Sequence, residues 1–80
     1  MMTDKRIPVT EAAQRVVDAV EEVVSFELHG NSLRFNFDKP RPVYPSRMIS
    51  ASATIFVGEL TVVEGSELQV IRQLRKMLDG

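Results

Sequence analysis

The stretch from Val24 to Phe37 constrains the fold of this 80-residue chain more than any other, because its large apolar residues alternate on both sides of Gly30-Asn31. Gly-Asn is typical of a two-residue hairpin turn of type I′ or II′. With that loop the cross-strand pairs are His29–Ser32, Leu28–Leu33, Glu27–Arg34, Phe26–Phe35 and Val24–Phe37. All large apolar residues then share one face, and the other face gains an ion pair between opposite charges. The pattern predicts an antiparallel hairpin in this register.

Two segments with a helical period of 3.6 residues lie on either side of the strand region. In the first, Thr10 is the expected N-cap and Glu11 lies in the first turn, where the helix dipole favours an acid. Its apolar stripe contains Ala13, Val16, Val17, Val20, Val23 and Val24. In the second, Ser66 and Gln69 have the spacing of a capping box. Its stripe contains Leu68, Ile71, Leu74 and Leu78, flanked by Val70 and Met77. Both segments are predicted to be amphipathic helices.

The residues from Ile49 to Val57 alternate in polarity and predict another strand. The alternation changes phase at Gly58-Glu59, because the next apolar positions are Leu60 and Val62. Gly58-Glu59 is therefore either a second two-residue turn or a bulge in one long strand. We favour the turn, which would pair Val57 with Leu60 on the core face.

These elements predict one α+β domain over residues 1–80, with the order α-β-β-β-β-α. An antiparallel sheet with one apolar face would carry both helices on that face, as a two-layer sandwich. Residues 1–8 are expected to be an N-terminal tail. Residues 38–47 are expected to be a Pro-rich, basic crossover loop between two hairpins, since three of the four prolines lie there. The opposite face of the sheet is predicted to be polar and open.

Composition excludes several kinds of chemistry. The chain has no cysteine, so it can form neither disulfides nor thiolate metal sites, and a reducing compartment is expected. No polar–apolar pattern of a signal peptide begins the chain, and no apolar run is long enough to span a bilayer. The one histidine, His29, has no nucleophile or orienting carboxylate grouped with it in the sequence. The four glycines are isolated, so no phosphate-binding loop is present. We expect a soluble, cytoplasmic protein that is not an enzyme and uses no metal or cofactor.

The segment 38–47 is the main candidate for function. It carries the only tyrosine together with cations, and the residue types Tyr and Arg are enriched at interface hot spots. The candidate interaction residues are Lys39, Arg41, Tyr44 and Arg47. Residues 42–47 also fit a short PxxPxR pattern of polyproline-II ligands, and Tyr44-Pro45 is a position where a cis bond can occur.

We therefore expect a small protein-interaction module, such as a regulator, an inhibitor or an assembly factor, including those of phage type. Its partner would be another protein or a second copy of the chain, with neither a membrane nor a small-molecule substrate involved. The alternative is a weak nucleic-acid-binding domain, in which the basic loop combines with cations of the last helix. Those further phosphate contacts would be Arg72, Arg75 and Lys76. The net charge of −1 gives no overall attraction to nucleic acid.

Overall fold

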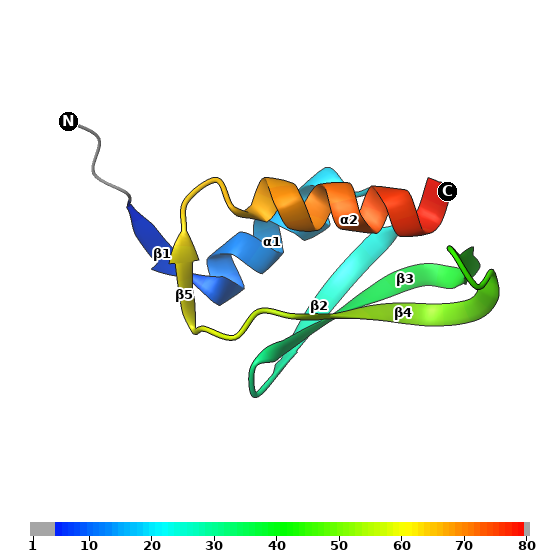
Figure 1. The fold of residues 1–80 in the computed structure, drawn as a ribbon, viewed down its shortest axis with the longest axis horizontal. Coiled ribbons are helices and arrows are strands. Elements are labelled where there is room, and N and C mark those ends of the chain that lie inside the picture. The colour runs from blue at the N-terminus through cyan, green and yellow to red at the C-terminus, as the bar shows by residue number, and fades with distance from the viewer. Residues whose placement is uncertain (1–4, 80) are drawn as a thin grey trace.

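A computed structural model of the protein describes residues 5–79, which form two helices and five strands (Figure 1). The elements are β1 (Arg6–Pro8), α1 (Val9–Ala19), β2 (Val23–His29), β3 (Ser32–Val43), β4 (Met48–Phe56), β5 (Thr61–Val63) and α2 (Glu67–Asp79). Strands β2, β3 and β4 form an antiparallel sheet in that order, and β1 pairs with β5 in a separate two-stranded sheet. The predicted α+β class is confirmed. The element order gains one strand at its start.

The hairpin of β2 and β3 has the predicted register. His29 pairs with Ser32, and the pairing continues without a shift to Ser25 and Asn36. Gly30 has a φ of 60°, a conformation that glycine adopts without the steric cost of a Cβ. One pair differs from the prediction: Val23, not Val24, lies opposite Phe37, because the register shifts at this end of β2. Val24 is consequently exposed.

Helix α1 begins two residues earlier than expected, with Pro8 and not Thr10 at the N-cap position, and it also ends earlier. It starts at Val9 directly after Pro8, so Thr10 lies inside the helix and is not its N-cap. Proline at a helix start removes no needed N–H group. The helix ends at Ala19, where the N–H of Val20 still bonds the carbonyl of Val16 at 2.9 Å. Val20 is the C-cap, and the next valines, Val23 and Val24, lie in β2, for which β-branched residues are better suited.

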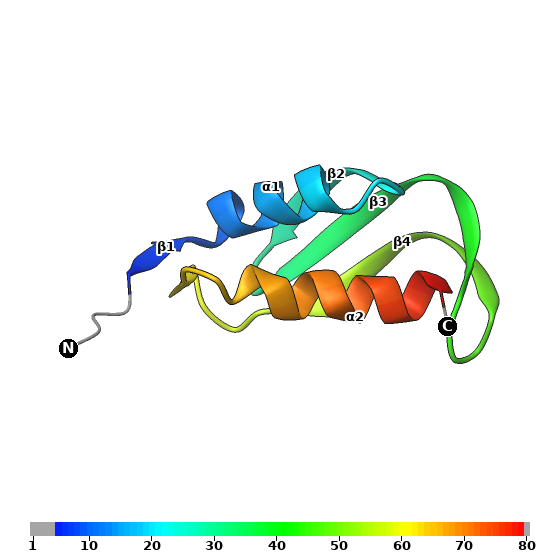
Figure 2. The ribbon, with the colours of Figure 1, turned by 90° about the horizontal axis from the view of Figure 1, so that it is seen from above.

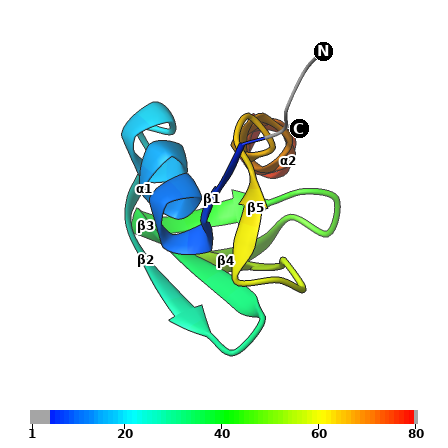
Figure 3. The ribbon, with the colours of Figure 1, turned by 90° about the vertical axis from the view of Figure 1, so that its left-hand side faces the viewer.

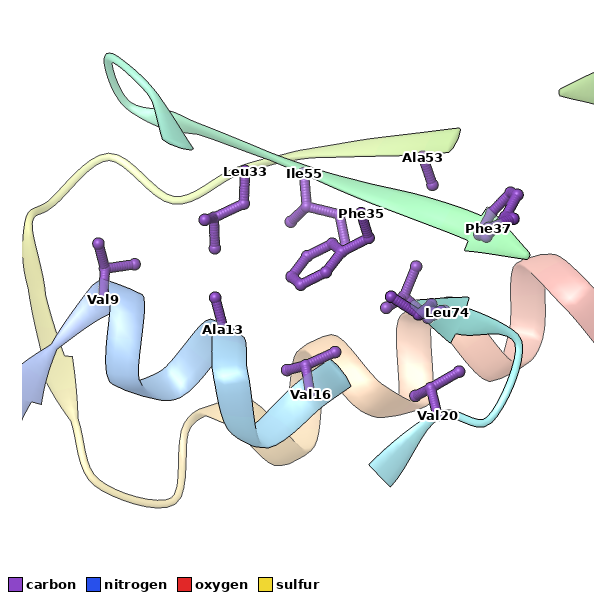
Figure 4. Close-up of a cluster of buried hydrophobic side chains, with 11 residues drawn as sticks. Val9, Ala13, Val16, Val20, Leu33, Phe35, Phe37, Ala53, Ile55 and Leu74 are labelled. Atoms are coloured by element: carbon purple, nitrogen blue, oxygen red, sulfur yellow. The ribbon is translucent and has the colours of Figure 1, made fainter. Parts of the chain in front are cut away.

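Both helices cover the same face of the three-stranded sheet, as predicted (Figure 3). The core lies between these layers, and its buried residues come from α1, the sheet and α2 (Figure 4). Its buried side chains are Val9, Ala13, Val16, Val20, Val23, Leu33, Phe35, Phe37, Ala53, Ile55 and Leu74. Phe35, at the centre of β3, and Leu74, in the middle of α2, are both completely buried and belong to this one core cluster.

Both interpretations of Gly58-Glu59 are wrong. Strand β4 ends at Phe56, and the next strand, β5, pairs with β1 and not with β4.

The prediction of an N-terminal tail is wrong for residues 6–8, which form β1. Residues 1–4 lie outside the described part of the chain. The pairing of β1 with β5 buries Ile7. On the exposed side of β1, the guanidinium of Arg6 forms an ion pair of 2.6 Å with the carboxylate of Glu59. The alternation places Leu60 and Val62 on a strand paired with the preceding one, whereas residues 61–63 pair with residues 6–8 near the start of the chain.

The predicted crossover loop at 38–47 is also wrong. β3 continues to Val43 and turns directly into β4, so only residues 44–47 form a loop. The pairing skips between Asn36 and Arg41, which lie opposite Ser52 and Ser50, so β3 contains three extra residues. Pro40 falls within this irregular stretch. Beyond Phe37, β3 has no β2 neighbour in the described chain, so a proline there removes no hydrogen bond on that side.

Candidate interaction groove at the hairpin tip

The tip of the β3–β4 hairpin folds back onto the C-terminal turns of α2 (Figure 2). The backbone N–H of Tyr44 donates a hydrogen bond of 2.8 Å to the carbonyl of Met77. Carbonyls in the last turn of a helix have no partner within the helix, so this bond satisfies a group that the helix leaves open. The contact fixes the tip against the helix end.

A groove of about 520 Å³ lies where these two parts meet. It is lined by Tyr44, Pro45, Gln73, Lys76 and Met77. The first two come from the loop, where the Tyr44–Pro45 peptide bond is cis. The other three share one side of α2, because residues three and four apart are neighbours on a helix. The groove thus joins two segments that are far apart in the sequence.

Cationic groups lie at the groove. The guanidinium of Arg47 is 5.5 Å from the centre of the Tyr44 ring, a distance that permits a cation–π contact. Arg47 itself has a φ of 62°, an uncommon conformation for a residue with a side chain. Within residues 5–79, neither Arg47 nor Lys76 makes an ion pair. Their charges therefore remain open to a partner.

The other predicted cations are arranged differently. Arg41 donates to both carboxylate oxygens of Asp38, at 3.0 and 2.9 Å. Arg75 binds Glu22 at 2.9 Å and lies 3.5 Å from Asp79. The hydrogen bond from Arg75 holds the pKa of the Glu22 carboxyl below its usual value.

Lys39 and Arg72 are exposed and make no ion pair within the described residues. Of the six cations that the sequence offered as one patch, Lys76 lines the groove, Arg47 lies over the ring of the groove residue Tyr44, and Arg41 and Arg75 are paired with carboxylates.

A second polar cluster lies on the outer face of the sheet, around Glu27. Its carboxylate accepts hydrogen bonds from Asn36 and Arg34, at 3.1 and 3.0 Å, and lies 3.0 Å from Nε2 of His29. These bonds, with Asn36 contributing most, lower the pKa of Glu27 to about 2. The predicted ion pair between Glu27 and Arg34 is confirmed.

The cluster around Glu27 offers little to acid–base chemistry. A hollow of about 240 Å³ lies beside it, lined by His29, Ser32, Arg34 and Thr54. A general base must lie within hydrogen-bond reach of the proton that it removes. Here the His29 ring is more than half exposed, and the carboxylate near it is already bound by Arg34 and Asn36. The arrangement pairs opposite charges on the surface of the sheet.

Residues 5–79 contain no cluster of three or more side chains able to hold a metal ion. None of the helices in this part of the chain is both long and apolar enough to cross a membrane. The PxxPxR interpretation is wrong, because Pro42 pairs with Ile49 inside β3 and residues 44–47 turn back.

Sequence reasoning missed Pro45, Gln73 and Met77 as groove residues. The spacing of Gln73, Lys76 and Met77 along one side of a helix was the available signal, but it has meaning only once the hairpin tip is seen to dock there.

Comparison with family models, with curated proteins and with solved structures finds no significant match to this chain.

Proposed function

We propose that this protein is a non-catalytic protein-interaction module that binds a segment of another protein in the hairpin-tip groove. The observation that carries the proposal is the groove itself, with Tyr44, Pro45 and Met77 forming its apolar lining. Tyrosine and methionine are enriched at protein interfaces. The hydrogen bond between Tyr44 and Met77 supports a preformed site, so little ordering would be needed on binding.

The charges indicate the chemistry of the partner. Lys76 lines the groove, and Arg47 lies on the Tyr44 ring without an ion pair in the described chain. A segment with an apolar side chain next to one or two carboxylates would complement both features. A role as a regulator, inhibitor or assembly factor in the cytoplasm fits such a module.

The test is selection of short peptides from a random displayed library on the isotope-labelled protein, followed by backbone NMR mapping. We expect enrichment of sequences with an acidic residue beside an apolar one, and shifts concentrated at Tyr44, Gln73 and Met77. Tyr44→Ala should abolish binding, and Lys76→Gln should weaken it by about tenfold.

Lys39→Gln is the matched control, because it removes the same charge from an exposed residue that does not line the groove. Peptides that map elsewhere, or a Lys39→Gln variant as impaired as Lys76→Gln, would refute the proposal.

The nucleic-acid alternative has less support. It needs a continuous set of free cations, whereas Arg41 and Arg75 are bound to carboxylates. Binding to DNA or RNA would show a steep salt dependence and would weaken when Arg72 and Lys76 are neutralised. Retention on either nucleic acid at low salt, sensitive to these variants, would favour this alternative over the protein-binding proposal.

A further inference from the structure

The strand β4, Met48–Phe56, lies at one edge of the three-stranded sheet and pairs only with β3 in the described chain. His29 and Ser32 flank the two-residue turn, so the backbone groups of Ser32 point toward β2. Ser32 therefore pairs with Phe56 without exchanging hydrogen bonds. By alternation, the N–H and C=O groups of Ser52, Thr54 and Phe56 point away from β3, toward the open edge. This edge can accept another strand.

Strand β4 has none of the features that usually prevent an edge strand from pairing with another chain. Proteins use charged residues, prolines or bulges to prevent an edge strand from pairing with another strand. The sequence of β4, Met-Ile-Ser-Ala-Ser-Ala-Thr-Ile-Phe, has no charge, no proline and no glycine. The opposite edge, β2, carries Glu27 and His29 and has a register shift after Val23. Of the two edges of this sheet, β4 is the one open to pairing.

The sequence of β4 also reads nearly the same in both directions. If two copies pair antiparallel about Ser52, each residue lies opposite one of its own class. The pairs are Met48–Phe56, Ile49–Ile55, Ser50–Thr54, Ala51–Ala53 and Ser52–Ser52. Antiparallel pairing about a two-fold axis is how a strand meets a second copy of itself, so this symmetry favours self-association over an unrelated partner.

Exposure of the end residues supports the same register. Met48 is 69% exposed and Phe56 is 74% exposed, the highest values among the large apolar residues of the described chain. Pairing about Ser52 brings each Met48 against the Phe56 of the other copy, at both ends of the interface. Contact between a thioether and an aromatic ring is favourable. On the other face, Ile49, 66% exposed, would meet Ile55 of the other copy and extend the buried layer. The small residues in the middle allow the backbones to approach.

We propose that the chain forms a homodimer in which the β4 strands of two copies pair antiparallel about Ser52. The two three-stranded sheets then become one sheet of six strands. The two-fold axis is perpendicular to the sheet, so the helices of both copies lie on the same side of it. This inference does not rest on the groove at the hairpin tip.

The test uses charge at the two-fold axis, where residue 52 faces itself. Ser52 lies on the polar outer face of the sheet, so Ser52→Lys and Ser52→Glu should both fold. Each variant alone places like charges opposite one another and should raise the dimer dissociation constant by at least about tenfold. An equimolar mixture should recover a heterodimer. Sedimentation equilibrium measures the dissociation constant of each variant alone and of the mixture, and circular dichroism confirms that the variants fold.

Ser25→Lys is the matched control, because it makes the same change on β2, the other edge, and should leave dimerisation unchanged. Since the chain has no cysteine, Ser52→Cys should also give a disulfide-linked dimer on oxidation, whereas Ser25→Cys should not. A wild-type protein that stays monomeric, or a dimer that Ser52→Lys and Ser25→Lys affect equally, would overturn the inference. Tyr44→Ala, which tests the groove, should leave the dimer intact, so the two proposals fail separately.

Discussion

Replacing Leu74 by alanine should destabilise the protein far more than the same change at Leu68. Both leucines lie on α2, and both belong to the apolar stripe that the sequence predicts. In the structure, Leu74 is 0% exposed and Leu68 is 53% exposed. The two substitutions therefore compare a buried leucine with a half-exposed one on the same helix.

The magnitude follows from burial. Removing a fully buried leucine costs its transfer free energy plus the energy of the cavity left behind, about 3–4 kcal/mol in total. Leu68→Ala leaves no closed cavity and loses only part of the transfer term, so it should cost below about 1 kcal/mol. Alanine is at least as good a helix former as leucine, so helix propensity does not add to either loss. For 80 residues, a total stability of about 4–12 kcal/mol means that Leu74→Ala removes a large share of it.

The measurement is urea unfolding followed by circular dichroism at one protein concentration for all variants. With a slope near 1 kcal/mol per molar urea, Leu74→Ala should lower the midpoint by about 3 M, and Leu68→Ala by less than about 1 M. Equal losses for the two variants, within about 0.5 kcal/mol, would show that α2 does not dock through Leu74. The arrangement of helix and sheet described above would then be wrong.

Two further predictions concern charged groups. The folded-state pKa of Glu27, about 2, lies below its ordinary value of 4.5, so its contribution to stability is present above pH 4.5 and is lost as the pH falls from there toward 2. Acid unfolding of Glu27→Gln should be less steep in that range than that of Glu21→Gln, and identical profiles would contradict the hydrogen-bond cluster. Arg75→Gln removes the ion pair with Glu22 and should cost about 0.5–1 kcal/mol at low salt in urea unfolding, less at high salt, whereas Arg72→Gln should cost almost nothing. A loss that salt does not reduce, or one equally large for Arg72→Gln, would rule out the ion pair as its source.

Local patterns predicted the β2–β3 hairpin well. Its register depends on a two-residue turn and on residues close in sequence, and both can be worked out before any tertiary contact is known. The single error, at Val24, occurs where the strand leaves the helix, and there the register shifts. The two amphipathic helices and the class of fold were predictable for the same reason, since a stripe of apolar residues requires a surface to cover it.

The candidate site was predictable only in part. Tyr44 and Lys76 were recognised as candidates, but in two separate hypotheses: Tyr44 for protein binding by the central loop, and Lys76 for phosphate binding by the last helix. Their position on one groove depends on the hairpin tip reaching the last turn of α2, and no local pattern encodes that contact. The ion pairs that bind Arg41 and Arg75 are equally invisible in a count of cations.

The sequence by itself determined the two amphipathic helices, the alternation that forms the strands on both sides of Gly30-Asn31 and from residue 49 onward, and how the first hairpin pairs. It also contains the near-symmetry of β4, which can be interpreted only once that strand is known to lie at an edge. Tertiary structure decided that residues 61–63 pair with residues 6–8, that the proline-rich segment extends β3, and that Leu74 and not Leu68 reaches the core. The physical reason is that periodicity and turn chemistry act over a few residues. The choice of neighbour depends on packing between segments far apart in the chain.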